Sequence, residues 1–351
     1  MNANFPVHMR AAVLHAWGDV RIESLPVPAP GPGELVFRVE ACGLCGSDAM
    51  PWYVSRKAPV VLGHEPAGVI VAVGADVHHL GPGDRVFVHH HAPCGNCPEC
   101  ERALWSNCAT WRSTRLDPGG FAEYARVPAP NVARDTLRLP DSIDFEVATF
   151  IEPVACCLRA VRRKGDVRPG DTVHVVGLGA MGLLMLQLAR ALGAGRVFGS
   201  DFADERRRLA LSLGLDAAFD PASTDPAAAV AGRTDGRGAD VVLVTPGGPE
   251  PVLDGIRAAA PGGRVVCFTP SSPDATLAID QGQLYFREIA LLQSYSCGPD
   301  ETRDALDLLA GGRLVVRPLI THRAGLDGVA AGLLRAVSID DGIKTVILPH
   351  S

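Results

Sequence analysis

The sequence predicts an α/β protein made of a β-rich part and a doubly wound parallel sheet. The chain has 351 residues, which is more than one hydrophobic core usually supports. Its first part carries short apolar runs separated by prolines and glycines, as β-strands and turns do. From about residue 153 onward, short apolar runs alternate with amphipathic stretches, which is typical of parallel strands joined by helices.

The first part is predicted to be β-rich from its strand-like runs and its turn residues. The proline-rich segment 26–33 cannot be the interior of a helix, because proline lacks the N–H that a helix needs. A Gly-Pro-Gly sequence at 81–83 forces a turn. The runs that we interpret as strands are residues 9–20, 36–40, 60–73 and 84–88.

The second part shows the alternation expected of a parallel sheet. Residues 181–192 and 204–213 are amphipathic and are predicted to be helices. Further along, residues 300–310 are predicted to be a helix and residues 344–348 a strand. The apolar runs that we interpret as the strands of the sheet are residues 171–176, 196–200, 240–244, 263–268 and 288–292.

The charge and the hydropathy of the chain exclude several classes of function. Hydrophobic residues make up 47% of the chain, and the net charge of −6 comes from interspersed acids and bases. No basic face is indicated, so we expect no binding to nucleic acid or to an anionic membrane. No apolar run reaches the length of about 18 residues that a membrane helix needs. The N-terminus carries no secretion signal, so we expect a cytoplasmic protein.

A glycine-rich turn between a strand and a helix predicts a nucleotide site. Residues 172–176 are strand-like, and a helical stretch begins at residue 183. In this context the glycines permit a tight turn, close approach of the backbone to a pyrophosphate, and close packing of helix on strand. The pyrophosphate would lie at the helix N-terminus. The residues of the turn are Gly177, Leu178, Gly179, Ala180, Met181 and Gly182.

Asp201 lies at the end of the next predicted strand, where a carboxylate can accept hydrogen bonds from the adenosine ribose hydroxyls. The same carboxylate would repel a 2′-phosphate, so NAD is favoured over NADP. Arg206 is a candidate for contact with the cofactor, because a guanidinium near the ribose could accept a phosphate. We nevertheless interpret residues 206–208 as solvated charges on the predicted helix.

Four closely spaced cysteines predict a structural zinc site. Two, two and seven residues separate consecutive cysteines, and this spacing places four thiolates within reach of one tetrahedral ion. A closed four-sulfur site leaves no room for a substrate, so its role is to hold a loop together. The four ligands are Cys94, Cys97, Cys100 and Cys108. The cysteines that we interpret as small buried residues are Cys42, Cys156, Cys157, Cys267 and Cys297.

Three consecutive histidines, His89, His90 and His91, precede the four cysteines. Side chains on a strand alternate between its two faces, so at most two of the three could converge on one metal ion. We favour a structural or solvent-exposed role for them over an additional metal site.

A second, open metal site is predicted from Cys45, His64 and a carboxylate. A thiolate, an imidazole nitrogen and a carboxylate oxygen form the three-ligand set of a catalytic zinc with one position left open. The carboxylate is either Glu65, next to His64, or a later one such as Glu152 in the sequence Ile-Glu-Pro at 151–153.

Together these motifs resemble the zinc-dependent medium-chain dehydrogenase family, which includes alcohol, sorbitol and threonine dehydrogenases. Residues 83–86, 119–124 and 343–346 share the resemblance, which covers nearly the whole chain from residue 9 onward. It implies a GroES-like catalytic domain with a Rossmann domain inserted in it, and a homodimer or homotetramer. The implied domains are residues 1–153 (catalytic, with the structural zinc loop), 154–295 (Rossmann) and 296–351 (the return to the catalytic domain).

The resemblance also implies roles for single residues. The catalytic zinc ligands would be Cys45, His64 and either Glu152 or Glu65. Glu152 stands where the alcohol-dehydrogenase branch has a cysteine and the sorbitol and threonine branch a glutamate, which places the chain on the polyol and amino-alcohol side. Further implied roles are orientation of the zinc histidine by Asp48, relay of the substrate proton by Ser47, and contact with the cofactor pyrophosphate by Lys344.

One position departs from the family pattern. Many members carry a histidine five residues after the zinc cysteine, where it passes the proton to solvent, and this chain has Met50 there. The relay must therefore end elsewhere, at Glu152, at Glu65 or at water.

We therefore expect an enzyme that reversibly oxidises a secondary alcohol to a ketone with NAD, using one catalytic and one structural zinc ion. The expected substrate is a polyol, a sugar, an inositol-like compound or an amino alcohol. The alternatives are a zinc-free reductase or a noncatalytic nucleotide-binding protein on the same fold. A zinc-ribbon protein that binds nucleic acid is disfavoured by the acidic net charge.

Overall fold

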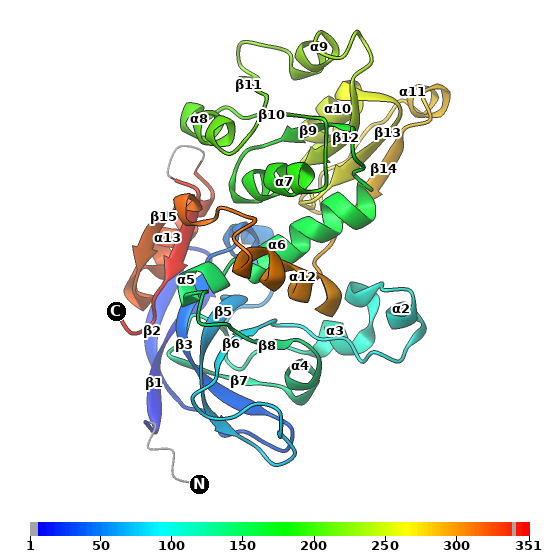
Figure 1. The fold of residues 1–351 in the computed structure, drawn as a ribbon. Helices are drawn as coiled ribbons and strands as arrows, with labels where there is room; N and C mark the ends of the chain where they lie inside the picture. Colours follow the sequence, from blue (N-terminus) through cyan, green and yellow to red (C-terminus); the bar gives the residue numbers. More distant parts are fainter. Residues whose placement is uncertain (1–5, 339–341) are drawn as a thin grey trace. The chain divides into compact units, whose positions relative to one another are not determined.

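The computed structural model describes residues 6–338 and 342–351, and it divides the chain into two compact units (Figure 1). The first five residues, part of the segment in which we expect no secretion signal, lie outside the described residues, as do residues 339–341. The second unit is formed by Cys156–Ser296 and Arg313–Val315. The first unit is formed by Met1–Ala155, Cys297–Gly312 and Val316–Ser351.

The second unit is built on a six-stranded parallel sheet in the order β11-β10-β9-β12-β13-β14. The chain starts in the middle of the sheet, adds two strands on one side and then three on the other, as a doubly wound Rossmann fold does. The predicted fold class is confirmed. The strands are β9 (Thr172–Val176), β10 (Arg196–Ser200), β11 (Ala217–Phe219), β12 (Ala239–Val244), β13 (Ala259–Cys267) and β14 (Ala290–Gln293).

Helices connect these strands and cover the sheet. The helix α7 (Ala180–Ala191) packs on β9 and β10, and its leucines are buried because the helix lies against the sheet. The helix α10 (Pro249–Ala258) packs on β12 and β13. The predicted helices at 181–192 and 204–213 are confirmed within one residue at either end. The remaining helices of this unit are α8 (Asp204–Ser212), α9 (Pro226–Ala231) and α11 (Gln281–Phe286).

The first unit is β-rich and is assembled from both ends of the chain. Its larger sheet follows the order β15-β16-β3-β5-β6-β8, with β7 paired to β3, and its smaller sheet follows β2-β1-β4. The C-terminal strand β16 pairs with β3, so the red and blue ends of Figure 1 share one sheet. The strands are β1 (His8–Ala16), β2 (Asp19–Pro26), β3 (Leu35–Gly43), β4 (Val60–Val61), β5 (Glu65–Val73), β6 (Arg85–Val88), β7 (Tyr124–Val127), β8 (Thr136–Arg138), β15 (Ile320–Ala324) and β16 (Lys344–Ile347).

Two predicted strands are wrong in extent, each because a glycine interrupts the run. Residues 9–20 form β1 and the start of β2, since Gly18 adopts a φ of 86° in the turn between them. Residues 60–73 form β4 and β5, which are separated by a bend where Gly63 has a φ of 89°. A left-handed glycine reverses or bends the chain without steric cost, so apolar residues on its two sides need not share a strand.

Short helices fill the connections of the first unit and the junctions of the chain. The longest of them, α12 (Pro299–Ala310), confirms the helix predicted at 300–310. The others are α1 (Pro51–Val54), α2 (Pro98–Glu101), α3 (Ala109–Ser113), α4 (Ala129–Arg134), α5 (Phe145–Ala148), α6 (Ile151–Leu158) and α13 (Val329–Ala336), with single turns at η1 (Gly46–Ala49), η2 (Trp105–Asn107), η4 (Arg317–Leu319) and η5 (Leu326–Gly328) and a π-helix at η3 (Arg159–Lys164).

Each unit has its own hydrophobic core. In the first unit Phe37 and Phe121 are fully buried among strand residues. In the second unit Val242 and Val265, from neighbouring strands, belong to a core that α10 covers. Among the described residues, no helix is long and apolar enough to cross a membrane.

The turn from β9 into α7 depends on Gly182. A Cβ atom at this position would lie 1.9 Å from the carbonyl oxygen of Gly177. We predict that Gly182→Ala lowers the free energy of unfolding by about 1–3 kcal/mol, because the helix must move away from the strand. Gly232→Ala is the matched control, since its nearest neighbour is an ordinary contact 3.4 Å away. Equal unfolding midpoints of the two variants in denaturant would contradict the prediction.

Candidate active site

The pairing of β3 with β5 brings the predicted metal ligands together. Gly43, the last residue of β3, lies opposite Glu65, the first residue of β5, in an antiparallel register. Cys45 follows β3 by two residues, and His64 directly precedes β5. Two segments that are 19 residues apart in the sequence therefore meet at one end of the sheet.

Cys45, His64 and Glu65 form a cluster that could hold a metal ion. Their ligand atoms all lie within 4.8 Å of one another. The ring of His64 has its Nδ1 3.2 Å from Oδ1 of Asp48, which leaves Nε2 as the nitrogen available to a metal. The hydroxyl of Ser47 donates to the sulfur of Cys45 at 3.4 Å. The structure thus brings together Cys45, Ser47, Asp48 and His64, which the sequence predicted around this centre, with Glu65, one of its two candidate carboxylates.

Glu65 is held by an ion pair with Lys344. The ammonium of Lys344 lies 2.5 Å from Oε2 of Glu65, and the two side chains are 2% and 0% exposed. The close approach requires Gly43, because a Cβ there would lie 1.9 Å from the same oxygen. The predicted contact of Lys344 with a cofactor pyrophosphate stays a prediction. In the structure the ammonium of Lys344 contacts the carboxylate of Glu65.

The electrostatics of the cluster follow from these contacts. Burial alone would lower the pKa of His64, but Asp48 and Cys45 raise it well above its ordinary value. Burial likewise lowers the pKa of Lys344. The negative charge of Glu65 has the opposite and larger effect, so the pKa of Lys344 is raised. Each buried charge in the cluster therefore has an opposite charge in contact with it, as buried ions require.

Zinc fits this cluster. A zinc-bound histidine usually donates its second ring N–H to a carboxylate, and Asp48 is placed to accept it from His64. Oε1 of Glu65 is buried and has no hydrogen-bond partner among the described residues, so one oxygen is left for a ligand bond. Thiolate, imidazole and carboxylate are all zinc ligands.

Glu152, the other candidate carboxylate, lies in a different group. It is the second residue of α6 and is 6% exposed. Among the described residues its ligand atom groups with those of His89 and His90 and, in a second group, with those of Cys156 and Cys297, each group lying within 4.8 Å. The expectation that the three histidines lie on a strand is wrong. The strand β6 ends at Val88, so strand alternation does not separate His89 from His90.

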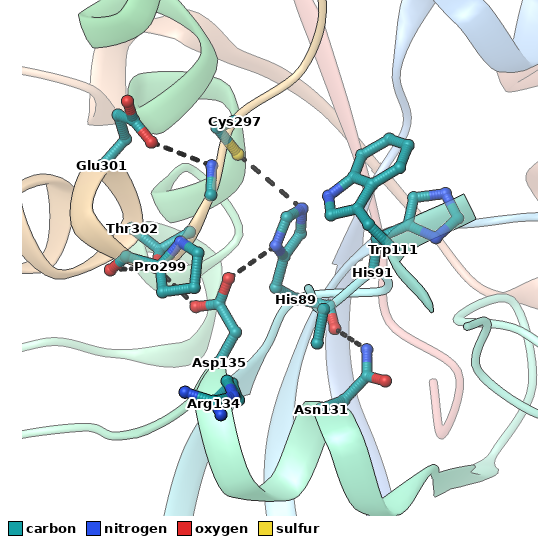
Figure 2. A network of polar contacts seen from close by, with 12 residues as sticks. His89, His91, Trp111, Asn131, Arg134, Asp135, Cys297, Pro299, Glu301 and Thr302 are labelled. Carbon is teal, nitrogen blue, oxygen red and sulfur yellow. Dashed lines mark hydrogen bonds and ion pairs between the residues drawn. The ribbon is translucent and has the colours of Figure 1, made fainter. Parts of the chain in front are cut away.

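His89 lies in a buried polar network that the sequence did not predict. Figure 2 shows its ring between Asp135 and Cys297. Asp135 precedes β8, which pairs with β6, and it also accepts a hydrogen bond from Thr302 on α12. The solvent-exposed alternative is therefore excluded for His89, which is fully buried. No spacing rule links an aspartate 46 residues away to a histidine, so only the strand register could reveal this contact.

The four predicted zinc cysteines form a second cluster. Their sulfur atoms lie 3.4 to 3.9 Å from one another where the contacts are direct, close to the spacing of about 3.8 Å expected around one tetrahedral zinc. The N–H groups of Cys94 and Gly95 donate to Cys108 and Cys100. Burial raises the pKa of Cys108, but the N–H groups of Cys94 and Trp111 bring it down to about 6. These donors favour the thiolate form that binds metal.

The glycine-rich turn has the shape expected of a phosphate-binding loop. Gly177 adopts a φ of 83°, and a Cβ there would lie 2.5 Å from Oγ1 of Thr245. Gly179, at the N-cap of α7, has an open surface, because its nearest neighbour is a guanidinium nitrogen of Arg206 at 3.9 Å. The N-terminus of α7, a helix of 12 residues, therefore begins beside open space at Gly179, and Ala180, Met181 and the buried Gly182 form its first turn.

Asp201 lies at the end of β10 beside this turn. Its Oδ2 accepts from the N–H of Leu178 at 2.7 Å, and its Oδ1 accepts from the N–H of Ala203 at 2.8 Å. Arg206 reaches to 3.9 Å from Oδ2, and its side chain is 18% exposed. The two backbone N–H groups thus fix the orientation of Asp201. Arg206 is mostly buried beside this carboxylate, whereas the sequence predicted a solvated charge.

Comparison with known proteins agrees with this arrangement. Residues 31–141 match the family model described as the alcohol dehydrogenase GroES-like domain, and residues 180–311 match the one described as zinc-binding dehydrogenase. The chain belongs to the zinc-dependent medium-chain dehydrogenase family. This dehydrogenase is 36% identical to an L-threonine 3-dehydrogenase of Pyrococcus abyssi over 317 residues, which covers 88% of each chain.

Other relatives of this dehydrogenase match most of its length. Sorbitol dehydrogenase of Homo sapiens is 32% identical over 326 residues, covering 90% of this chain and 89% of the relative. A zinc-binding dehydrogenase of Sinorhizobium meliloti 1021 solved with NADP superposes with a TM-score of 0.88 at 33% identity, covering 98% of this chain and 100% of that one. The protein is therefore an oxidoreductase of the zinc-binding alcohol dehydrogenase type.

The ion pair between Lys344 and Glu65 should contribute strongly to the stability of this dehydrogenase. We predict that Lys344→Met lowers the free energy of unfolding by about 3–5 kcal/mol, because it leaves a buried carboxylate without its counter-charge. The double variant Glu65→Gln/Lys344→Met should recover part of the loss.

The matched control is Lys57→Met, since Lys57 is exposed, and its effect should stay within about 0.5 kcal/mol. Chemical unfolding followed by tryptophan fluorescence measures all of these values. A Lys344→Met protein as stable as the control would show that the pair is not needed.

Proposed function

We propose that this dehydrogenase reversibly oxidises a secondary alcohol to a ketone and that its cofactor is NAD. The observation that carries the proposal is the Cys45–His64–Glu65 cluster, with Asp48 on the second nitrogen of the histidine. This donor set suits a catalytic zinc with one open position. A fully closed site, such as the four-cysteine cluster, would serve structure alone.

We assign Cys45, His64 and Glu65 as ligands of the catalytic zinc. Glu65 is preferred to Glu152 because its atoms group with Cys45 and His64 and because its Oε1 is left without a partner among the described residues. Lys344 neutralises the other oxygen and keeps the carboxylate in place. The structural zinc is assigned to Cys94, Cys97, Cys100 and Cys108.

The chemistry divides between the bound groups and the residues of the chain. When bound, the zinc polarises the substrate oxygen and lowers its pKa, while the nicotinamide exchanges hydride with the carbon. Asp48 holds the imidazole of His64 in one orientation and one tautomer. Ser47 lies beside Cys45 and is the hydroxyl placed to take the substrate proton during oxidation and return it during reduction. Met50 cannot carry that proton further, so the relay from Ser47 ends at water, at Glu65 or at Glu152.

The cofactor preference rests on Asp201. Each carboxylate oxygen accepts one backbone N–H, which leaves further lone pairs for the ribose hydroxyls. The negative charge opposes a 2′-phosphate, although Arg206 is near enough to weaken that opposition.

For the substrate we propose a polyol, a sugar, an inositol-like compound or an amino alcohol. A site with a carboxylate ligand and buried polar side chains offers partners to the neighbouring hydroxyl or amino groups of such compounds. Two relatives are named for compounds of this kind, since sorbitol is a polyol and threonine carries an amino group beside a hydroxyl.

A spectrophotometric screen tests the proposal. Polyols, sugars, inositols and amino alcohols are each offered with NAD and with NADP, and the reduced cofactor is followed by absorbance. We expect at least one secondary alcohol to reduce NAD faster than NADP. Activity confined to NADP would overturn the cofactor assignment, and reduction of carbonyls without any dependence on zinc would favour a zinc-free reductase.

Cys45→Ala tests the role of the metal. We predict that turnover falls by at least about 10³-fold, because one catalytic zinc ligand is lost, while NAD still binds. Metal analysis should show about one zinc ion per chain fewer, and cofactor binding is measured by fluorescence titration. Cys42→Ala is the control, since Cys42 is buried three residues away and belongs to no metal-ligating group among the described residues. Unchanged turnover in Cys45→Ala would remove zinc from the mechanism.

A further inference from the structure

The turn between β10 and α8 carries the carboxylate that we assign to the ribose of the cofactor. Asp201 directly follows β10, and Phe202 and Ala203 complete the connection to α8. Phe202 is 61% exposed, so packing of its side chain in the core does not hold this turn. The carboxylate of Asp201 accepts from the N–H groups of Leu178 and Ala203. Ala203 belongs to the turn itself, so the carboxylate is placed only as well as the turn is.

Arg207 on α8 donates two hydrogen bonds to the backbone of this turn. Its Nη1 donates to the carbonyl oxygen of Asp201 at 2.6 Å and to that of Phe202 at 2.7 Å. Side chains on a helix lean toward its N-terminus, so a residue near the start of a helix reaches back over the chain that precedes it. Arg207 is the fourth residue of α8, and its guanidinium therefore lies over the turn.

The other terminal nitrogen of Arg207 connects the turn to the sheet. Nη2 lies 3.4 Å from Oδ1 of Asp204 at the start of α8 and 3.6 Å from Oδ2 of Asp220, which directly follows β11. The strand β11 pairs with β10, with Phe219 opposite Ser200. The side chain of Arg207 is only 15% exposed, so water competes little for these contacts. One guanidinium thus joins the turn, the helix and the neighbouring strand.

The stability of α8 itself does not explain an arginine at this position. A positive charge in the first turn of a helix lies at the positive end of the helix dipole, where acidic residues such as Asp204 and Glu205 are favourable instead. Burying most of a guanidinium also costs free energy unless its N–H groups are used. The contacts with the turn and with Asp220 are what compensate for both effects.

We propose that Arg207 is a positioning residue for the cofactor, which holds the backbone of Asp201 and Phe202 so that the carboxylate of Asp201 meets the hydroxyls of the adenosine ribose. The inference rests on the proposed function in one respect, which is the assignment of that ribose to Asp201. Arg207 acts through the turn, because its terminal nitrogens contact two carbonyl oxygens and two carboxylates of the chain.

Calorimetric titration with two dinucleotides tests this role. NAD and its analogue without the 2′-hydroxyl of the adenosine ribose, 2′-deoxy-NAD, are titrated into the wild-type enzyme and into Arg207→Met. In the wild type, loss of the hydroxyl should weaken binding about tenfold, which is typical of a hydrogen bond to a charged group. In Arg207→Met the same loss should matter less than about twofold, because the carboxylate is no longer aligned, and NAD should bind about tenfold more weakly than to the wild type.

Two further variants separate positioning from folding. Arg208→Met is the matched control, since Arg208 is the next residue of α8, is 67% exposed and lies 3.2 Å from Asp204. It should bind both dinucleotides as the wild type does. Arg207→Lys should recover part of the discrimination, because an ammonium can also donate to carbonyl oxygens. A role confined to folding would reduce the number of binding sites for both dinucleotides and leave the ratio of their affinities unchanged.

The outcomes distinguish this inference from the proposed function. If Arg207→Met discriminates between the two dinucleotides as strongly as the wild type, the positioning role is overturned and the assignment of Asp201 stands. Loss of discrimination in Arg208→Met would also overturn it, because any change of charge on α8 would then have the same effect. If the wild type itself binds NAD and 2′-deoxy-NAD equally well, the assignment of the ribose to Asp201 is wrong and the inference falls with it.

Discussion

The antiparallel pairing of β3 with β5 is the constraint on which the site depends. Because Gly43 lies opposite Glu65, the residues that follow β3 and precede β5 must meet at one end of the sheet. The absence of a side chain at Gly43 then leaves room for the carboxylate of Glu65 and the ammonium of Lys344. Lys344 arrives on β16, which pairs with β3 from the C-terminal end of the chain. One strand thus aligns residues from three distant segments.

Buried charge is the second organising principle of the catalytic unit. Ions are costly to bury, so they persist where an opposite charge or a hydrogen-bond donor is in contact. The pairs Glu65 with Lys344 and Asp135 with His89 both satisfy this requirement with side chains that are almost fully buried. Each pair fixes the orientation of its two side chains as well as their positions. A rigid histidine whose far nitrogen is already bonded presents its other nitrogen in a fixed direction, which is what a metal ligand needs.

Sequence patterns predicted the features that depend on residues close together in the chain. The turn from β9 to α7 needs glycine at Gly177, where φ is 83°, and at Gly182, where a Cβ would lie 1.9 Å from the carbonyl oxygen of Gly177. The four cysteines converge because their spacing alone keeps them in one loop. The extents of the first strands were less predictable, since an apolar run looks the same whether it forms one strand or two. The roles of Lys344 and His89 could not be predicted locally, because their partners lie far along the chain.

The sequence by itself determined the fold class, the glycine-rich turn between strand and helix, the clustering of four cysteines in one loop and the candidate ligands Cys45 and His64. These follow from spacing, periodicity and the conformational needs of glycine, which act over short distances along the chain. Only the tertiary structure decided which carboxylate joins Cys45, which residue neutralises Glu65, and that His89 and His90 converge on Glu152. The reason is that strand register and burial, not sequence distance, set which side chains meet, and both arise only when the sheet has formed.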